Sequence, residues 1–95
     1  MPGYNRAEIS AELSVVTSRE AEKSPREQIE AAKQAASDSG LAHEAGPETT
    51  VLAGGRSEAL EAMLGVIEAS LDAGARAVQV KVEAEGEASR FGGER

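Results

Sequence analysis

The residues best suited to chemistry lie in one short run, from His43 to Gly55, in the middle of the chain. This run holds the single histidine of the sequence beside Glu44, followed by the threonine pair Thr49 and Thr50. A carboxylate accepts hydrogen bonds, a hydroxyl donates and accepts them, and an imidazole can also act as a base. The combination makes this run the best candidate for contact with a small molecule.

The same residues also have a purely structural interpretation. Threonine is a common strand residue, and a glutamate or histidine in a short strand often only faces water. The sequence contains no Gly-x-Ser-x-Gly elbow, no phosphate-binding loop and no Gly-x-Gly-x-x-Gly turn. With no cysteine and one histidine, a metal site would need oxygen ligands alone, and the acidic residues form no such loop. We therefore expect no catalytic residue, no metal and no cofactor.

The composition narrows the class of partner. The chain has 95 residues, of which 17 are Asp or Glu and 10 are Lys or Arg, and its net charge is -7. An acidic surface repels phosphate backbones, so nucleic acid is not an expected partner, whereas a cationic small molecule is compatible. The same charge can also serve solubility alone. No apolar stretch approaches the roughly 20 residues of a membrane span, and we expect no membrane partner and a cytoplasmic location.

The elements that must position the candidate residues are indicated by periodicity and capping signals. Residues 7–16 alternate apolar and polar side chains, which predicts a strand with one buried face. Ser24 and Pro25 mark the start of a helix that should run to about Ser39 and end at Gly40. The buried stripe of this helix is expected to consist of Ile29, Ala32, Ala35 and Ala36.

The candidate run itself is typical of a hairpin. Residues 41–45 and 49–53 are predicted to be extended, with Gly46-Pro47-Glu48 as the turn between them. Gly54-Gly55 should end the second of these strands. The polar residues would then lie on a hairpin held between two helices.

A second helix and a last strand follow the hairpin. Ser57 is expected to cap a helix over residues 58–73, and Gly74 is expected to end it. The core-facing stripe of this helix is predicted to be Leu60, Met63, Leu64, Ile67 and Leu71. Residues 77–84 alternate again, and their apolar face should consist of Val78, Val80 and Val82. Residues 85–95 are expected to form a flexible tail on a single domain, residues 1–95, that is ordered over about residues 7–84.

The element order βαββαβ predicts an α+β, ferredoxin-like fold, in which a four-stranded antiparallel sheet carries both helices on one face. We expect the strands at residues 7–16 and 77–84 to be central neighbours, with their apolar faces against the helices. Their polar residues then point to the open face, where Glu12 and Lys81 can pair. An open sheet face stays wet, packs on another sheet or forms the floor of a ligand site.

Three stretches of the sequence carry a resemblance to a known family. They are the strand EISAELSVV, the hairpin HEAGPETTV and the ending GARAVQV, with Gly54 between the last two. In this order, over about residues 7–83, they resemble the thiamine-binding protein family, the YkoF-like group of ferredoxin-like domains.

The resemblance implies a non-catalytic domain that binds thiamine or its hydroxymethylpyrimidine half and assembles through its sheets into a homodimer or homotetramer. The ligand contacts that it implies are Ser14, His43, Glu44, Pro47, Thr49 and Thr50. An aminopyrimidine needs an acceptor for its amino group and a donor for a ring nitrogen, and Glu44 with Thr49 or Thr50 can supply both.

Two other functions stay open on the sequence. A structural oligomer would pack its polar sheet faces against another copy and bind no ligand. A small dimeric enzyme of the α/β-barrel type would use His43 as its base. The three hypotheses differ in what they require of the hairpin, because only the first and third need its polar side chains to meet a small molecule.

Overall fold

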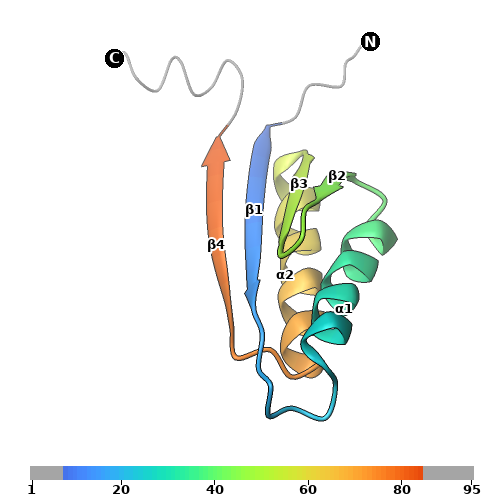
Figure 1. The fold of residues 1–95 in the computed structure, drawn as a ribbon. Helices are drawn as coiled ribbons and strands as arrows, with labels where there is room; N and C mark the ends of the chain where they lie inside the picture. Colours follow the sequence, from blue (N-terminus) through green and yellow to red (C-terminus); the bar gives the residue numbers. More distant parts are fainter. Residues whose placement is uncertain (1–7, 85–95) are drawn as a thin grey trace.

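A computed structural model of the chain describes residues 8–84 and contains four strands and two helices in the predicted order (Figure 1). The elements are β1 (Ile9–Val16), α1 (Pro25–Asp38), β2 (Ala42–Ala45), β3 (Thr49–Gly54), α2 (Arg56–Asp72) and β4 (Ala77–Ala84). Each lies within two residues of its predicted bounds. Ala7 and the expected tail, residues 85–95, lie outside the described residues.

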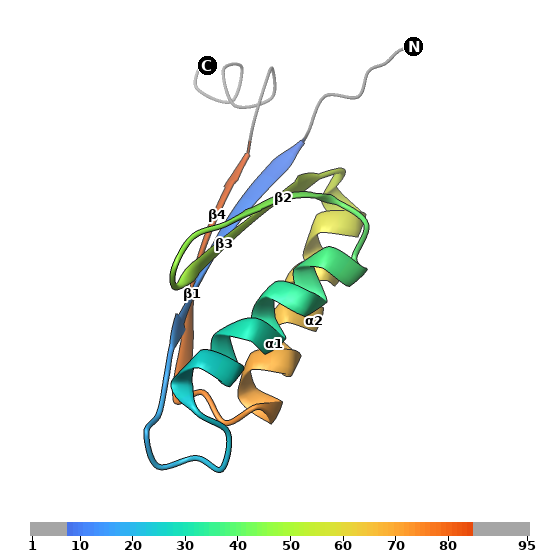
Figure 2. The same cartoon turned by 45° about the vertical axis from the view of Figure 1, so that its right-hand side comes forward.

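The four strands form one antiparallel sheet in the order β2-β3-β1-β4. Both helices lie on one face of this sheet (Figure 2), so the fold is the predicted ferredoxin-like α+β arrangement. The first and last strands are neighbours, as expected, but β4 is an edge strand, and the second central strand is β3. Each helix carries the chain across one intervening strand, so β3 inserts beside β1 and β4 takes the other side of β1.

Strand β1 supplies the centre of the core, and its predicted alternation is confirmed. Ala11, Leu13 and Val15 are buried, whereas Glu12 is exposed. The buried cluster consists of Ala11, Leu13, Val15, Ala32, Ala36, Leu52, Val66 and Ala75. Half of these residues are alanines, so the helices approach the sheet closely while each buried side chain contributes little apolar area.

Helix α1 begins as the sequence predicts. The hydroxyl of Ser24 accepts a hydrogen bond from the backbone N of Glu27 at 3.2 Å, and Glu27 Oε1 accepts one from the backbone N of Ser24 at 2.8 Å. This is a capping box, which satisfies two backbone donors at once. The predicted stripe is also confirmed, since two of its members are fully buried and two are partly buried against the core. Gly40 follows the helix with a left-handed φ of 77°.

Helix α2 begins two residues earlier than predicted. Its N-cap is Gly55 rather than Ser57, and the cap residue offers no side-chain hydrogen bond. The carboxylate of Glu8 takes this role, because its Oε1 accepts a hydrogen bond from the backbone N of Arg56 at 2.9 Å. Negative charge is favourable at a helix N-terminus. The start of α2 is therefore tied to the residue that precedes β1.

The predicted core-facing stripe of α2 is wrong for its three leucines. Leu60, Leu64 and Leu71 are 44%, 55% and 49% exposed. The other two predicted members, Met63 and Ile67, are partly buried against the core. The fully buried residues of this region are smaller: Ala59, Val66, Ser70 and Ala73. Most positions of α2 are apolar or small, so the sequence fits two adjacent stripes equally well. The stripe of small residues faces the sheet because it allows the helix backbone to approach closely.

The apolar face of β4 is only partly covered. Val78 packs against the core, but Val80 and Val82 are 39% and 43% exposed. They lie opposite Leu13 and Ala11 of β1, and so they point to the helix side of the sheet as predicted. The expected contact of this face with the helices is incomplete, because neither helix lies behind β4 (Figure 1).

A buried glutamine that the sequence analysis did not single out holds the connection between β1 and α1. Gln28 is fully buried. Its Oε1 accepts a hydrogen bond from the backbone N of Ser18 at 2.8 Å, and its Nε2 donates to the carbonyl oxygens of Ser18 and Lys23 at 2.8 and 2.9 Å. One side chain thus satisfies three backbone groups in a segment without regular secondary structure.

We expect Gln28→Leu to lower the free energy of unfolding by about 2–4 kcal/mol, because it leaves these backbone groups without their partner. Urea denaturation monitored by circular dichroism measures the change. Gln34→Leu is the matched control, because Gln34 is exposed and bonds only Asp38 Oδ1, at 2.9 Å. Its effect should stay within about 0.5 kcal/mol. Equal losses in the two variants would contradict the anchoring role of Gln28.

Replacing Gly65, within α2, and Gly74, just after it, with alanine should change the stability of the protein in opposite directions. Gly74 has a φ of 106°, and a Cβ there would overlap the methyl group of Ala21. Gly74→Ala should therefore cost about 1–3 kcal/mol of stability. Gly65 lies inside α2 with nothing within 4 Å of an added Cβ, so Gly65→Ala should add about 0.5–1 kcal/mol. Thermal unfolding tests both, and a higher Tm for Gly74→Ala would refute the steric argument.

Candidate functional site

The face of the sheet away from the helices brings together polar residues from three strands. Ser14 of β1 lies opposite Thr49 of β3, and Glu44 of β2 lies opposite Val51 of β3. Directly paired residues share a face of the sheet, and so do residues two apart on one strand. The alternate residues of β3, Thr50 and Leu52, are buried on the helix side. These four residues therefore form one continuous surface, which we call the open-face site: Ser14, Glu44, Thr49 and Val51.

Backbone hydrogen bonds fix the hairpin turn against β1. The backbone N of Gly46 donates to the carbonyl oxygen of Thr49 at 2.7 Å, which closes the turn. The backbone N of Val15 donates to the carbonyl oxygen of Glu48 at 3.0 Å, which attaches the turn to β1. Pro47 lies exposed at the tip, beside the open-face site rather than within it. The position of the site therefore does not depend on a free loop.

A shallow, open depression lies on this surface. It is lined by Glu44, Ala45, Gly46, Thr49 and Val51. Glu44 is exposed, whereas Thr49 and Val51 are half-buried at its floor. The depression thus combines a carboxylate acceptor, a hydroxyl and an aliphatic surface, and it can hold a small flat polar group with its other side in water.

Thr50 lies on the other face of the sheet. It is opposite Leu13 of β1 and is 2% exposed. Neighbouring residues of a strand point to opposite faces, so the hydroxyls of Thr49 and Thr50 cannot serve the same site. Of the two threonines, Thr49 is the one that accompanies Glu44.

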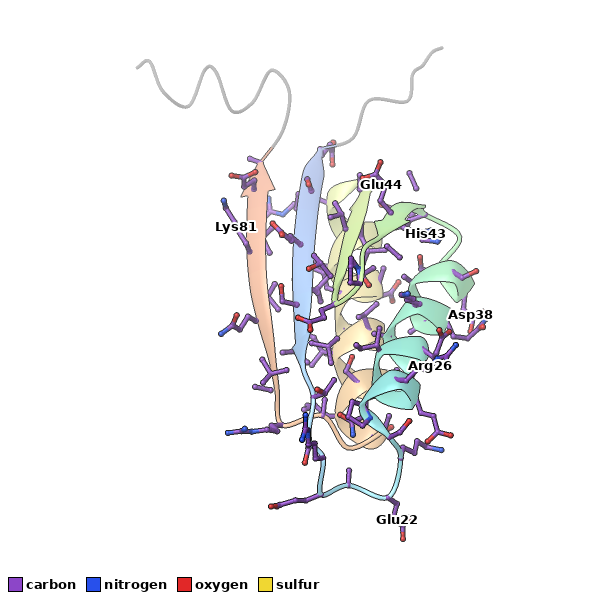
Figure 3. All side chains as sticks on the ribbon, viewed as in Figure 1. Glu22, Arg26, Asp38, His43, Glu44 and Lys81 are labelled. Carbon is purple, nitrogen blue, oxygen red and sulfur yellow. The ribbon has the colours of Figure 1, made fainter. Side chains whose placement is uncertain are left out.

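His43 is also separated from the open-face site. It lies opposite the buried Leu52, and so it belongs to the helix side of the sheet, on the exposed edge strand β2. Its Nδ1 is 3.0 Å from the carbonyl oxygen of Leu41. Figure 3 labels His43 and Glu44 as neighbours on β2. The side chains of His43 and Glu44, although adjacent in sequence, therefore lie on opposite faces of the sheet.

The charges on the open face are mainly negative. Glu12, Glu44 and Glu83 lie on this face together with Lys81. Glu12 is directly opposite Lys81 in the register, as expected, but the ammonium group of Lys81 lies 3.6 Å from Glu83 Oε2 on its own strand. Both members of this ion pair are largely exposed, so it adds little stability. A cation would meet a favourable field over this face.

A second hollow, which sequence reasoning missed, lies where β1 ends. It is lined by Thr17, Ser18, Arg19, Glu20 and Arg76. The backbone N of Arg76 donates to the carbonyl oxygen of Val16 at 2.9 Å, which joins the start of β4 to the end of β1. Two arginines from segments far apart in the sequence therefore border one polar hollow. Neither segment has a periodic pattern that could have signalled their proximity.

Two further findings concern metals and membranes. Within residues 8–84, no three histidine or acidic side chains come close enough to hold a metal ion. Neither α1 nor α2, the helices of the described part, has the length and apolar character needed to cross a membrane.

Three solved structures resemble the chain in fold. The domain of unknown function DUF77 from Bacillus cereus is 23% identical, with a TM-score of 0.67 over 85% of this chain and 77% of that one. A protein from Thermotoga maritima, provisionally assigned to thiamine biosynthesis or salvage, is 18% identical, with a TM-score of 0.66 over 93% and 99%. A hypothetical protein from Methanocaldococcus jannascii is 18% identical, with a TM-score of 0.62 over 86% and 82%.

These likenesses establish the fold and extend over most of each compared chain. No protein-family model and no curated protein sequence matches the chain. The chemistry of this protein therefore has to be argued from its own side chains.

Proposed function

We propose that this protein is a non-catalytic domain that binds thiamine or its hydroxymethylpyrimidine half on the open face of its sheet, and that it acts as a homodimer or homotetramer. The observation that carries the proposal is the meeting of Glu44 of β2 and Thr49 of β3 at one shallow depression, with Ser14 of β1 directly opposite Thr49 on the same face. The family resemblance of the sequence and the thiamine-related assignment of the Thermotoga maritima neighbour both support it.

The open-face site suits the hydrogen bonds of an aminopyrimidine. The exocyclic amino group donates, and the Glu44 carboxylate accepts. A ring nitrogen accepts, and the Thr49 hydroxyl donates. Because both side chains border the same depression, a single ring can reach both at once. The Ser14 hydroxyl lies opposite Thr49 and is placed to bond a substituent of the ring.

The remaining surface of the ligand also finds suitable partners. Residues 8–84 contain no Phe, Tyr or Trp, so the ring would rest on the aliphatic surface of Val51 rather than stack. Thiamine carries a permanent positive charge on its thiazolium ring, and the open face is mainly acidic. A solvated, weakly enclosed contact of this kind favours modest affinity, in the micromolar to millimolar range.

A structural oligomer without a ligand is the second candidate. It is favoured by the exposed leucines of α2 and the exposed valines of β4, which offer an apolar surface for assembly. An enzyme using His43 has less support, because His43 lies on the other face from Glu44 and Thr49. His43 also lies exposed on the edge strand β2, where it borders neither the depression of the open-face site nor the hollow at the end of β1.

Titration calorimetry with thiamine and with hydroxymethylpyrimidine tests the proposal. We expect saturable heat with the unmodified protein, and Glu44→Gln should weaken binding about tenfold or more, because a charged acceptor is lost. Glu30→Gln is the matched control, because it removes the same charge from an exposed position of α1. No heat with either compound at millimolar concentration would sink the proposal and favour the structural oligomer.

The two adjacent threonines provide a second, sharper test of the site. Thr49→Val should weaken ligand binding several-fold, because it removes a hydroxyl from the open face. Thr50→Val should leave the affinity unchanged, because Thr50 is buried on the helix side. Calorimetry with the same two compounds measures both variants. The reverse order of effects would place the ligand on the helix side of the sheet.

The enzyme hypothesis has its own test in His43→Ala. Since His43 is exposed and apart from the open-face site, the variant should fold and bind the ligand as the unmodified protein does. Circular dichroism and calorimetry check the two expectations. A substrate turnover that the unmodified protein shows and His43→Ala lacks would establish the enzyme instead.

A further inference from the structure

One side of the molecule exposes large apolar side chains from two elements. Leu60, Leu64 and Leu71 of α2 are about half exposed, and Val80 and Val82 of β4 are 39% and 43% exposed. We call this surface the α2–β4 flank. Five large aliphatic side chains on a domain of this size are too many for scattered surface residues, and a cluster of this kind marks an interaction site.

The leucines and the valines belong to the same side of the molecule. On α2, the buried Ala59 and Val66 define the direction of the sheet, and Ala62 and Gly65 border the hollow shared with α1. With 100° between successive residues, the three leucines fall on the side of α2 away from α1. That side faces β4, because α2 contacts β4 whereas α1 packs against β1, β2 and β3. The flank is therefore continuous from helix to strand.

Strand β4 also has an unpaired edge. It is eight residues long and pairs with β1 on one side only. Sheet edges are usually protected by a charge that points inward, a proline, a bulge or a covering segment. The inward-pointing residues here are valines, residues 77–84 contain no proline, and neither helix lies behind β4 (Figure 1). The edge is thus open to another strand in the part of the chain that the structure describes.

We propose that the occupant of the α2–β4 flank is a second copy of this chain, whose β4 pairs antiparallel with β4 around a twofold axis. The two sheets would then form one continuous sheet of eight strands, with all four helices on one face. An isologous interface needs a surface that complements itself, and an antiparallel strand pair does so by symmetry. This inference specifies the assembly part of the proposed function and does not depend on its ligand.

The charges of β4 select a register for this pairing. With Val82 on the twofold axis, Lys81 faces the partner's Glu83 on the open face, and Glu83 faces the partner's Lys81. On the helix side, Val82 meets its own copy and Val80 meets the partner's Ala84. Opposite charges that face each other across strands are stabilising, and like charges are destabilising. Both faces of β4 are therefore complementary in this register.

The same geometry brings the leucines of the two copies together. Helix α2 packs against both β1 and β3, between one and two strands from the edge, so the two α2 axes would be about four strand spacings apart, about 19 Å. Two helices with their side chains need roughly 10–12 Å. The remaining space beside the axis is filled by large side chains from the N-terminal half of α2 that the isolated chain leaves exposed, Leu60 and Leu64 from each copy. Leu71, near the C-terminal end of α2, lies farther from the axis.

Sedimentation velocity and light scattering on the full chain test this interface. We expect a dimer for the unmodified protein, and Val82→Asp should raise its dissociation constant about 100-fold or more, because a charge would be buried at the axis without a partner. Leu64→Ser should also weaken the dimer, because it removes an apolar side chain of α2 from the interface. Since Leu64 is exposed in the isolated chain, this variant should still fold. Ala42→Asp is the matched control, since it places the same charge on the exposed strand β2 at the opposite edge of the sheet.

The outcomes separate this interface from assembly in general. A monomeric unmodified protein at tens of micromolar overturns both the oligomeric part of the proposed function and this interface, and leaves ligand binding to its own test. A dimer that survives both Val82→Asp and Leu64→Ser overturns this interface and leaves assembly through another surface. Loss of the dimer in these two variants, with retention in Ala42→Asp, supports it.

A charge exchange tests the register. Lys81→Glu should weaken the dimer, because the introduced carboxylate of one copy would face the partner's Glu83, and adding Glu83→Lys to the same chain should restore it. Equal dissociation constants for the unmodified protein, the single variant and the double variant would overturn the register centred on Val82.

Discussion

The position of β1 in the middle of the sheet is the constraint on which the rest of the structure depends. It pairs with β3 on one side and with β4 on the other, so its pleat sets the two faces for most of the sheet. One face sends Leu13 into the core, and the other carries Ser14 to the hairpin. A shift of one residue in either pairing would exchange these roles and expose the core.

The core around β1 is small, and this explains why the surface is not uniformly polar. Half of the main buried cluster is alanine, which lets α1 and α2 lie close to the sheet. Close approach leaves no room for the leucines of α2 beneath the helix, so they emerge at its flank. A domain of this length buries only about 60–65% of the surface of its unfolded chain. The small residues of the core allow tight packing, and the leucines that do not fit beneath α2 form an apolar surface on its flank.

Local signals predicted the elements well and the packing less well. Ser24, Pro25 and Glu27 start α1 through backbone contacts within one turn, so neighbours in sequence suffice to predict it. The cap of α2 comes from Glu8, almost fifty residues away, and no local pattern around Ser57 could reveal it. The anchor at Gln28 was missed for a similar reason, since its partners lie in an irregular segment that folds back onto the helix.

The sequence by itself determined the order of strands and helices, the alternation of β1 and the polar character of the hairpin. These properties depend on periodicity and on contacts within a few residues. Only the tertiary structure decided that Thr49, rather than Thr50 or His43, joins Glu44 and Ser14, and that β4 lies at an open edge. Strand register depends on hydrogen bonds between segments far apart in the chain, and the position of each helix depends on the side-chain volumes beneath it. These contacts form only when the sheet assembles on both sides of β1.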